Sequence, residues 1–179
     1  MLRRLGYGSV RGDLVVPTGE PRPAVEVLDR FLAHHVVVAV ARGLPAGAGQ
    51  RLVDGWDVRH ALTGDEAEYL ADAADGVHVE DAARALGAEA VAILAWALGL
   101  APEPPLDEPV DTLPEPVVPD EPSLRPTVEL HRAAARYEAM ADALRADPDL
   151  AVGAAPGAVD PYVVHERRAA LRWLLDEPT

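Results

Sequence analysis

Hydrophobic positions recur along this chain with spacings of three and four residues in several long segments. This spacing is typical of amphipathic helices, because a helix with 3.6 residues per turn then carries its apolar side chains on one face. It predicts a last helix beginning at Asp160 and earlier helices at about residues 24–42, 63–74, 79–100 and 127–145. The expected fold class is therefore mostly α, a single-domain bundle of five or six helices.

Local signals support several of these boundaries. Thr63 and Glu66 have the spacing of a capping box, and Asp160 is followed by Pro161, which is a favoured helix start. The β-branched run at residues 36–40 leaves a strand open for the second half of the first helix, and the glycine-rich residues 44–49 are expected to break the chain. The second half of the 79–100 helix is apolar on almost all sides, which predicts that it lies at the centre of the bundle.

Residues 101–126 form a proline-rich stretch that contains nine prolines. Such a stretch favours an extended, largely polyproline-II conformation. It also carries seven acidic residues and one arginine, and so contributes −6 to the net charge of −14. Two interpretations compete, an interdomain linker and a strap across a single domain of residues 1–179. The strap is favoured because each flanking piece is too small for a good core. Residues 1–23 are expected to form an extended lead-in.

Two charged residues occupy positions where apolar side chains belong. Arg167 lies in the middle of the apolar stripe of the last helix, and Glu89 shares the apolar face of the 79–100 helix. A buried charge costs several kcal/mol alone, and the cost falls when it is paired with good geometry. The simplest hypothesis is a buried Glu89–Arg167 ion pair that clamps the two helices together. Arg168, and Glu166 beside Trp173, would extend this pair into a network.

The alternative is that the pair lines a pocket between the two tryptophan-bearing helices. These helices carry Trp96 and Trp173. In such a pocket Arg167 and Arg168 would suit bidentate binding of a carboxylate or phosphate, and Glu89 would act as a general base.

Other chemistry is sparse in the sequence. The six histidines lack the spacing of zinc or di-iron ligands, so no metal and no cofactor are expected, and His35 is interpreted as a hydrogen-bonded core residue. The chain contains no GxSxG, GxGxxG or Walker A pattern and no cysteine, so no catalytic residue is assigned.

The net charge of −14 argues against nucleic acid and anionic membrane surfaces as partners. The absence of lysine and asparagine indicates codon bias, so the all-arginine cation set is not read as a recognition device. No apolar run approaches the ~20 residues that a bilayer span requires, and the N-terminus lacks the apolar region of a secretory signal. These features predict a cytoplasmic protein.

The segments DPYVVHERRAALRWLL and EAVAILAWALGL resemble a bacterial family known as domain of unknown function 4272. Its C-terminal signature, Val-Val-x-Glu-Arg-His-x-Ala-Leu-x-Trp-Leu, falls here on Val163, Val164, Glu166, Arg167, Ala170, Leu171, Trp173 and Leu174. Arg168 stands in place of the family's histidine, and the proline-rich stretch is longer than in the family. The upstream segment includes Glu89, Trp96 and Gly99. The resemblance implies a mostly helical fold and no particular mechanism.

Three functions follow from these observations as hypotheses. The favoured one is a non-catalytic interaction protein, of accessory or immunity type, whose acidic strap binds a protein partner with a basic surface. The second is a small-ligand-binding protein or enzyme that uses the Glu89–Arg167 pocket. The third is a structural subunit of an assembly, and the sequence leaves the oligomeric state open.

Overall fold

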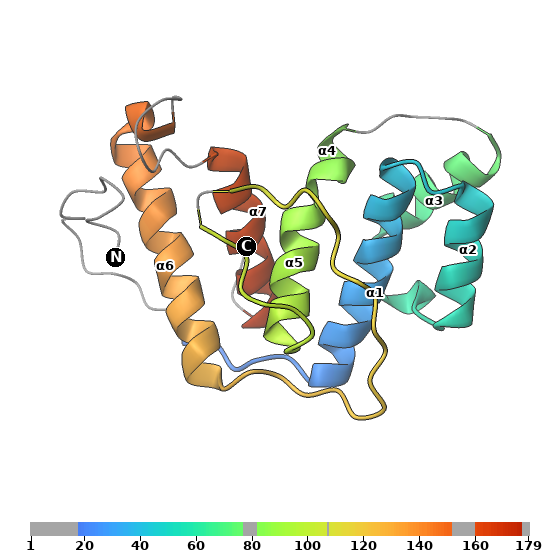
Figure 1. The fold of residues 1–179 in the computed structure, drawn as a ribbon, viewed down its shortest axis with the longest axis horizontal. Helices are drawn as coiled ribbons and strands as arrows, with labels where there is room; N and C mark the ends of the chain where they lie inside the picture. Colours follow the sequence, from blue (N-terminus) through green and yellow to red (C-terminus); the bar gives the residue numbers. More distant parts are fainter. Residues whose placement is uncertain (1–17, 77–81, 107, 152–159, 177–179) are drawn as a thin grey trace.

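The computed structural model describes residues 18–76, 82–106, 108–151 and 160–176. Within these ranges the chain is a mostly α, single-domain helical bundle with no strand, which confirms the predicted fold class (Figure 1). Its elements in chain order are α1 (Ala24–Ala41), α2 (Ala46–Gly55), the 3-10 turn η2 (Arg59–Ala61), α3 (Gly64–Ala74), α4 (Ala82–Leu86), α5 (Ala88–Ala97), α6 (Thr127–Ala146), the 3-10 turn η3 (Pro148–Ala151) and α7 (Pro161–Leu174).

Helix α5 lies at the centre of the bundle, between α1 on one side and α7 on the other. Helix α6 packs against α7, and α2 and α3 cover the far side of α1 (Figure 1). Every residue of α5 except Ala90 is buried, because helices and an extended segment surround it. The apolar character of this segment on all sides is the physical reason for its central place.

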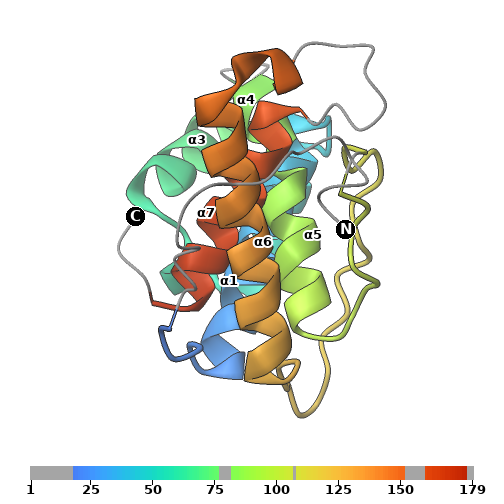
Figure 2. The ribbon, with the colours of Figure 1, turned by 90° about the vertical axis from the view of Figure 1, so that its left-hand side faces the viewer.

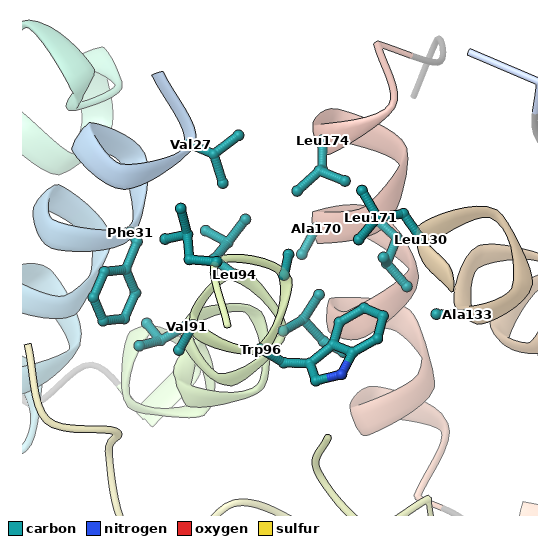
Figure 3. Packing of buried hydrophobic residues seen from close by; sticks show 14 of the residues in the cluster. Val27, Phe31, Val91, Leu94, Trp96, Leu130, Ala133, Ala170, Leu171 and Leu174 are labelled. Atoms are coloured by element: carbon teal, nitrogen blue, oxygen red, sulfur yellow. The ribbon is translucent and has the colours of Figure 1, made fainter. Parts of the chain in front are cut away.

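The main core is shared by α1, α5, α6 and α7. Figure 3 shows Phe31 of α1 beside Val91 of α5, and Leu171 and Ala170 of α7 on the opposite side of α5. A second, smaller apolar cluster joins α1 to α2 and α3 through Val36, Val40 and Tyr69, among others. The apolar stripe of α1 is therefore wide enough to serve two neighbours.

The prediction of one helix over residues 79–100 is wrong, because the chain forms two helices, α4 and α5, separated at Gly87. Residues 79–81 lie outside the described residues. Gly87 is where this segment meets α1: a Cβ atom there would lie 2.9 Å from Nε2 of His34 and 3.1 Å from Cγ2 of Val38. Glycine permits this close approach, and the Gly87 amide donates to the Arg84 carbonyl at 3.0 Å in a tight turn.

Residues 44–49 do not simply break the chain, because α2 begins at Ala46 within them. Gly49 faces α1, and a Cβ atom there would lie only 2.6 Å from Cγ2 of Val40. The glycine thus allows the two helices to approach closely. The β-branched run at residues 36–40 is helical, so the strand alternative is also wrong.

Both predicted helix starts are confirmed. Thr63 and Glu66 form a reciprocal capping box at the start of α3. The side chain of Asp160 accepts a hydrogen bond from the Tyr162 amide at 2.8 Å, with Pro161 in the first turn of α7.

The proline-rich segment 101–126, called the strap from here on, contains no helix or strand among its described residues. It runs along the edge of the bundle beside α5 (Figure 2). Pro104 and Leu106 are buried, and Val110, Leu113 and Leu124 pack partly buried against the main core. None of the helices in the described ranges has the length and apolar character needed to cross a bilayer.

Candidate functional site

Glu89 of α5 and Arg167 of α7 are in direct contact inside the bundle. Nε of Arg167 donates to Oε2 of Glu89 at 2.7 Å, and Arg167 and Glu89 are 0% and 3% exposed. Arg167 is among the largest fully buried side chains of the described residues. The pair therefore has the low-dielectric surroundings in which an unpaired charge would be most costly.

The rest of the Arg167 guanidinium binds mainly the backbone of the strap. Nη1 donates to the Pro105 carbonyl and, at 3.2 Å, to Oη of Tyr137, while Nη2 donates to the Glu108 carbonyl at 2.9 Å. Burial raises the pKa of Tyr137, although the nearby Arg167 charge opposes that rise. All three guanidinium nitrogens thus have partners within the protein.

The second oxygen of Glu89 also holds the strap, since Oε1 accepts a hydrogen bond from the Val110 amide at 2.6 Å. Arg42, at the end of α1, adds hydrogen bonds to the carbonyls of Val110 and Asp111 at 3.2 and 2.8 Å. Backbone groups of the strap at residues 105, 108, 110 and 111 are therefore held by side chains from α1, α5 and α7. Neither the strap carbonyls nor Arg42 was found by sequence reasoning.

These contacts define what the pair can do chemically. Both carboxylate oxygens of Glu89 accept hydrogen bonds from protein groups, and all three guanidinium nitrogens of Arg167 donate to protein groups. The geometry therefore favours an anchor between two helices and the strap over a general base facing a ligand.

The other candidate residues on α7 do not join Glu89. Nε of Arg168 donates to Oε2 of Glu138 on α6 at 2.7 Å, and Arg172 approaches the other oxygen of Glu138 at 3.4 Å. Glu166 forms no ion pair with any part of the chain that the structure describes. Neighbours on a helix point about 100° apart, so residues 166 and 168 face away from the partner of Arg167.

The two tryptophans lie in different surroundings. Trp96 is 4% exposed, and its ring lies 5.4 Å from the Arg125 guanidinium. Trp173 is half-buried, with the guanidinium of Arg22 at 4.9 Å from its ring.

A surface cavity of about 300 Å³ opens where the strap passes α6. It is lined by Trp96, Glu103, Arg125, Glu129, Arg132 and Arg136, and is called the arginine groove below. Trp96 is the one candidate residue from the sequence that contributes to it.

A protein-family model described as Domain of unknown function (DUF4272) matches residues 15–179. The chain belongs to the DUF4272 family. The match covers the Glu89–Arg167 pair, the strap and the arginine groove. No curated protein and no solved structure matches the chain. Membership in the DUF4272 family implies no particular activity.

A second buried polar cluster pins α3 to α1 in this DUF4272 chain. Glu66, which is 5% exposed, accepts hydrogen bonds from Arg30 at 2.6 and 2.9 Å and lies 2.7 Å from Nδ1 of His34. Burial by itself would raise the pKa of Glu66, but hydrogen bonds from His34 and Arg30 and the Arg30 charge lower it well below its usual range. The sequence indicated Glu66 only as a capping residue. The i,i+4 spacing of Arg30 and His34, which places both on one face of α1, was the available signal for this cluster.

His35 is 8% exposed, and its Nδ1 has no hydrogen-bond partner within the described part of the chain. The expectation of a hydrogen-bonded core histidine is therefore wrong for this atom. Burial, and then the electrostatic effect of His34, lowers the pKa of His35 and so favours the neutral ring. The ring packs edge-on against Phe31 instead. Within the described residues no cluster of three or more His, Cys, Asp or Glu side chains could hold a metal ion.

Proposed function

We propose that this protein is a non-catalytic interaction protein whose strap binds a partner protein with a basic surface. The observation that carries the proposal is the division of the strap between its backbone and its side chains. Its backbone groups bind inward to Arg167, Glu89 and Arg42, while the acidic side chains that the structure describes are exposed.

The outer surface of the strap combines charge with apolar area. Its exposed acidic residues are Glu103, Glu108, Asp111, Glu115, Asp120 and Glu121. Val117 and Val118 are 45% and 52% exposed, and they lie between Glu115 and Asp120 in the sequence. A partner with a shallow apolar groove, flanked by lysine or arginine, would complement this pattern.

The anchoring also supports the proposal energetically. A free peptide loses backbone conformational freedom when it binds, at a cost of about 1–2 kcal/mol per fixed residue. The strap is already held extended along the bundle, so less of this cost remains at the moment of binding. Such a protein would serve in the cytoplasm as an accessory or immunity-type factor, and a neighbouring gene for a basic toxin or a larger complex would favour that role.

Site-specific photo-crosslinking in the native host tests the proposal. A photoreactive residue at Val118 should capture a basic protein, whereas the same residue at Glu68, which is exposed on α3, should not. Neutralising Glu115, Asp120 and Glu121 together should weaken the capture at Val118, and added salt should do the same.

Native mass spectrometry on gently purified protein gives the independent readout. A retained basic partner supports the proposal. A bare monomer, together with identical crosslinks from positions 118 and 68, contradicts it, and a closed assembly of identical subunits would point to a structural subunit instead.

A further inference from the structure

We infer that the arginine groove is a binding site for a small ligand that carries two oxyanion groups, either carboxylates or phosphates. The inference does not rest on the proposed partner of the strap, because the groove residues differ from the exposed Val117–Val118 region.

The groove brings together cations from two segments. Arg132 and Arg136 lie four residues apart on α6, so they share one face of the helix, and Arg125 lies just before α6 begins. Arg125 is positioned by a 2.7 Å hydrogen bond from its Nε to the Trp96 carbonyl. The volume of about 300 Å³ is at the lower end of the range for small-molecule sites, which suits a compact ligand.

The charges of the groove are not balanced from within. Arg136 pairs with Glu103 of the strap at 2.5 Å, and Arg125 lies 3.5 Å from Glu129. Arg132 is exposed and has no ion pair or side-chain hydrogen bond in the described ranges. Three guanidinium groups therefore face two carboxylates, in a protein whose net charge is −14.

The guanidinium chemistry identifies the class of ligand. A guanidinium presents its N–H groups in a planar fork that matches the two oxygens of a carboxylate or phosphate. Like charges at i,i+4 on a helix repel each other, and an oxyanion between Arg132 and Arg136 would remove that repulsion. A second oxyanion would lie within reach of Arg125. The acidic surface elsewhere repels large polyanions, so a small dianion fits better than nucleic acid.

Glu103 gives the site a competing group. Its carboxylate already occupies Arg136, as an oxyanion of the ligand would. A ligand must therefore displace Glu103, and removing this carboxylate should strengthen binding. If anions were only attracted to the surface in general, removing Glu103 would change their binding by no more than the removal of any other single carboxylate.

Isothermal titration calorimetry on the full chain at constant ionic strength tests the inference with two probes, citrate and pyrophosphate. The two probes distinguish carboxylate from phosphate ligands. The variants are Arg132→Gln and Glu103→Gln, with Arg145→Gln as a matched control. Arg145 is exposed on the same helix, about 20 Å from Arg132 along the axis at 1.5 Å per residue. Because Arg132 and Arg145 are both exposed, neither glutamine should disturb folding, and circular dichroism checks this.

The expected result is saturable binding of at least one probe at one site. Arg132→Gln should weaken it about tenfold, since a charge-assisted hydrogen bond of the ligand is lost. Arg145→Gln should leave the affinity unchanged and Glu103→Gln should raise it. The inference is overturned if neither probe saturates at millimolar concentration. Equal losses in Arg132→Gln and Arg145→Gln would also overturn it, because the probes would then be screening the surface rather than occupying the groove.

Discussion

Replacing Arg167 by methionine should destabilise the protein far more than the removal of an exposed charge. Methionine keeps the unbranched apolar stem of the side chain but lacks the guanidinium group, so it leaves the Glu89 carboxylate, which is 3% exposed, without its cation. Glu89 would retain one hydrogen bond, from the Val110 amide. The strap carbonyls that Arg167 binds, and the buried Oη of Tyr137, would also lose their donor, which adds to the cost.

The magnitude follows from the isolated buried charge. Removing one partner of a buried ion pair costs about 3–5 kcal/mol. Domains of this size unfold with about 5–15 kcal/mol, so the variant should lose a large share of its stability. The double variant Glu89→Leu, Arg167→Met removes both charges, and it should be more stable than Arg167→Met alone because no uncompensated charge remains.

Urea denaturation followed by circular dichroism and tryptophan fluorescence measures these free energies of unfolding. Hydrogen exchange at the Val110 amide reports the strap separately, and it should accelerate in Arg167→Met and in the double variant. Arg172→Met is the matched control on α7, since Arg172 is partly exposed and lies 3.4 Å from Glu138, and it should cost about 1 kcal/mol or less. The reasoning is refuted if Arg167→Met costs no more than Arg172→Met, or if the double variant is no more stable than Arg167→Met.

Three further predictions concern the α1 side of the bundle. Gly49→Ala should destabilise the protein by about 1–3 kcal/mol, because the new Cβ would lie 2.6 Å from Cγ2 of Val40. Gly47→Ala in the same helix is the control, since its Cβ would meet its nearest neighbour at 3.7 Å. In the same urea assay this control should be neutral or stabilising. His35 has a lowered pKa, so the unfolded state binds its proton first and stability should fall as pH drops below the unfolded value of 6.5, by up to about 1.4 kcal/mol per pH unit. His35→Leu should flatten the pH profile in that window, and an unchanged slope would count against the assignment. The pKa of Glu66 is also lowered, so its contribution should be present above the ordinary value of 4.5 and lost at lower pH, and Glu66→Gln should remove that acid-induced loss in a series of thermal melts.

The sequence by itself determined the helical class and much of the local structure. Apolar spacing places the helices, and side-chain chemistry next to the backbone sets the Thr63 and Asp160 caps. Proline likewise keeps residues 101–126 out of regular structure wherever the strap is described. The apolar stripes also marked Glu89 and Arg167 as charges out of place. All of these signals are local, since each depends on residues within a few positions of one another.

The tertiary structure decided what those charges bind. Arg167 and Glu89 hold carbonyl and amide groups of the strap, and every residue type carries a carbonyl, so the sequence contains no signal for these contacts. The roles of Gly49 and Gly87 also could not be predicted from the sequence. The low helix propensity of glycine predicts a break at 44–49, and a single glycine at 87 gives no clear signal inside an apolar helical pattern. The role of both is the close approach to α1, which is defined by atoms far away in the sequence.

The arginine groove also could not be predicted from the sequence. Its residues come from α5, the strap and α6, and none of them stands out within its own segment except Trp96. An exposed arginine on a helix is ordinary, and three become a site when packing brings them around one cavity. Local patterns along the chain report which face of a helix is buried. Local patterns do not show which surfaces and backbone groups meet at that face. The packing of the helices against one another decides this.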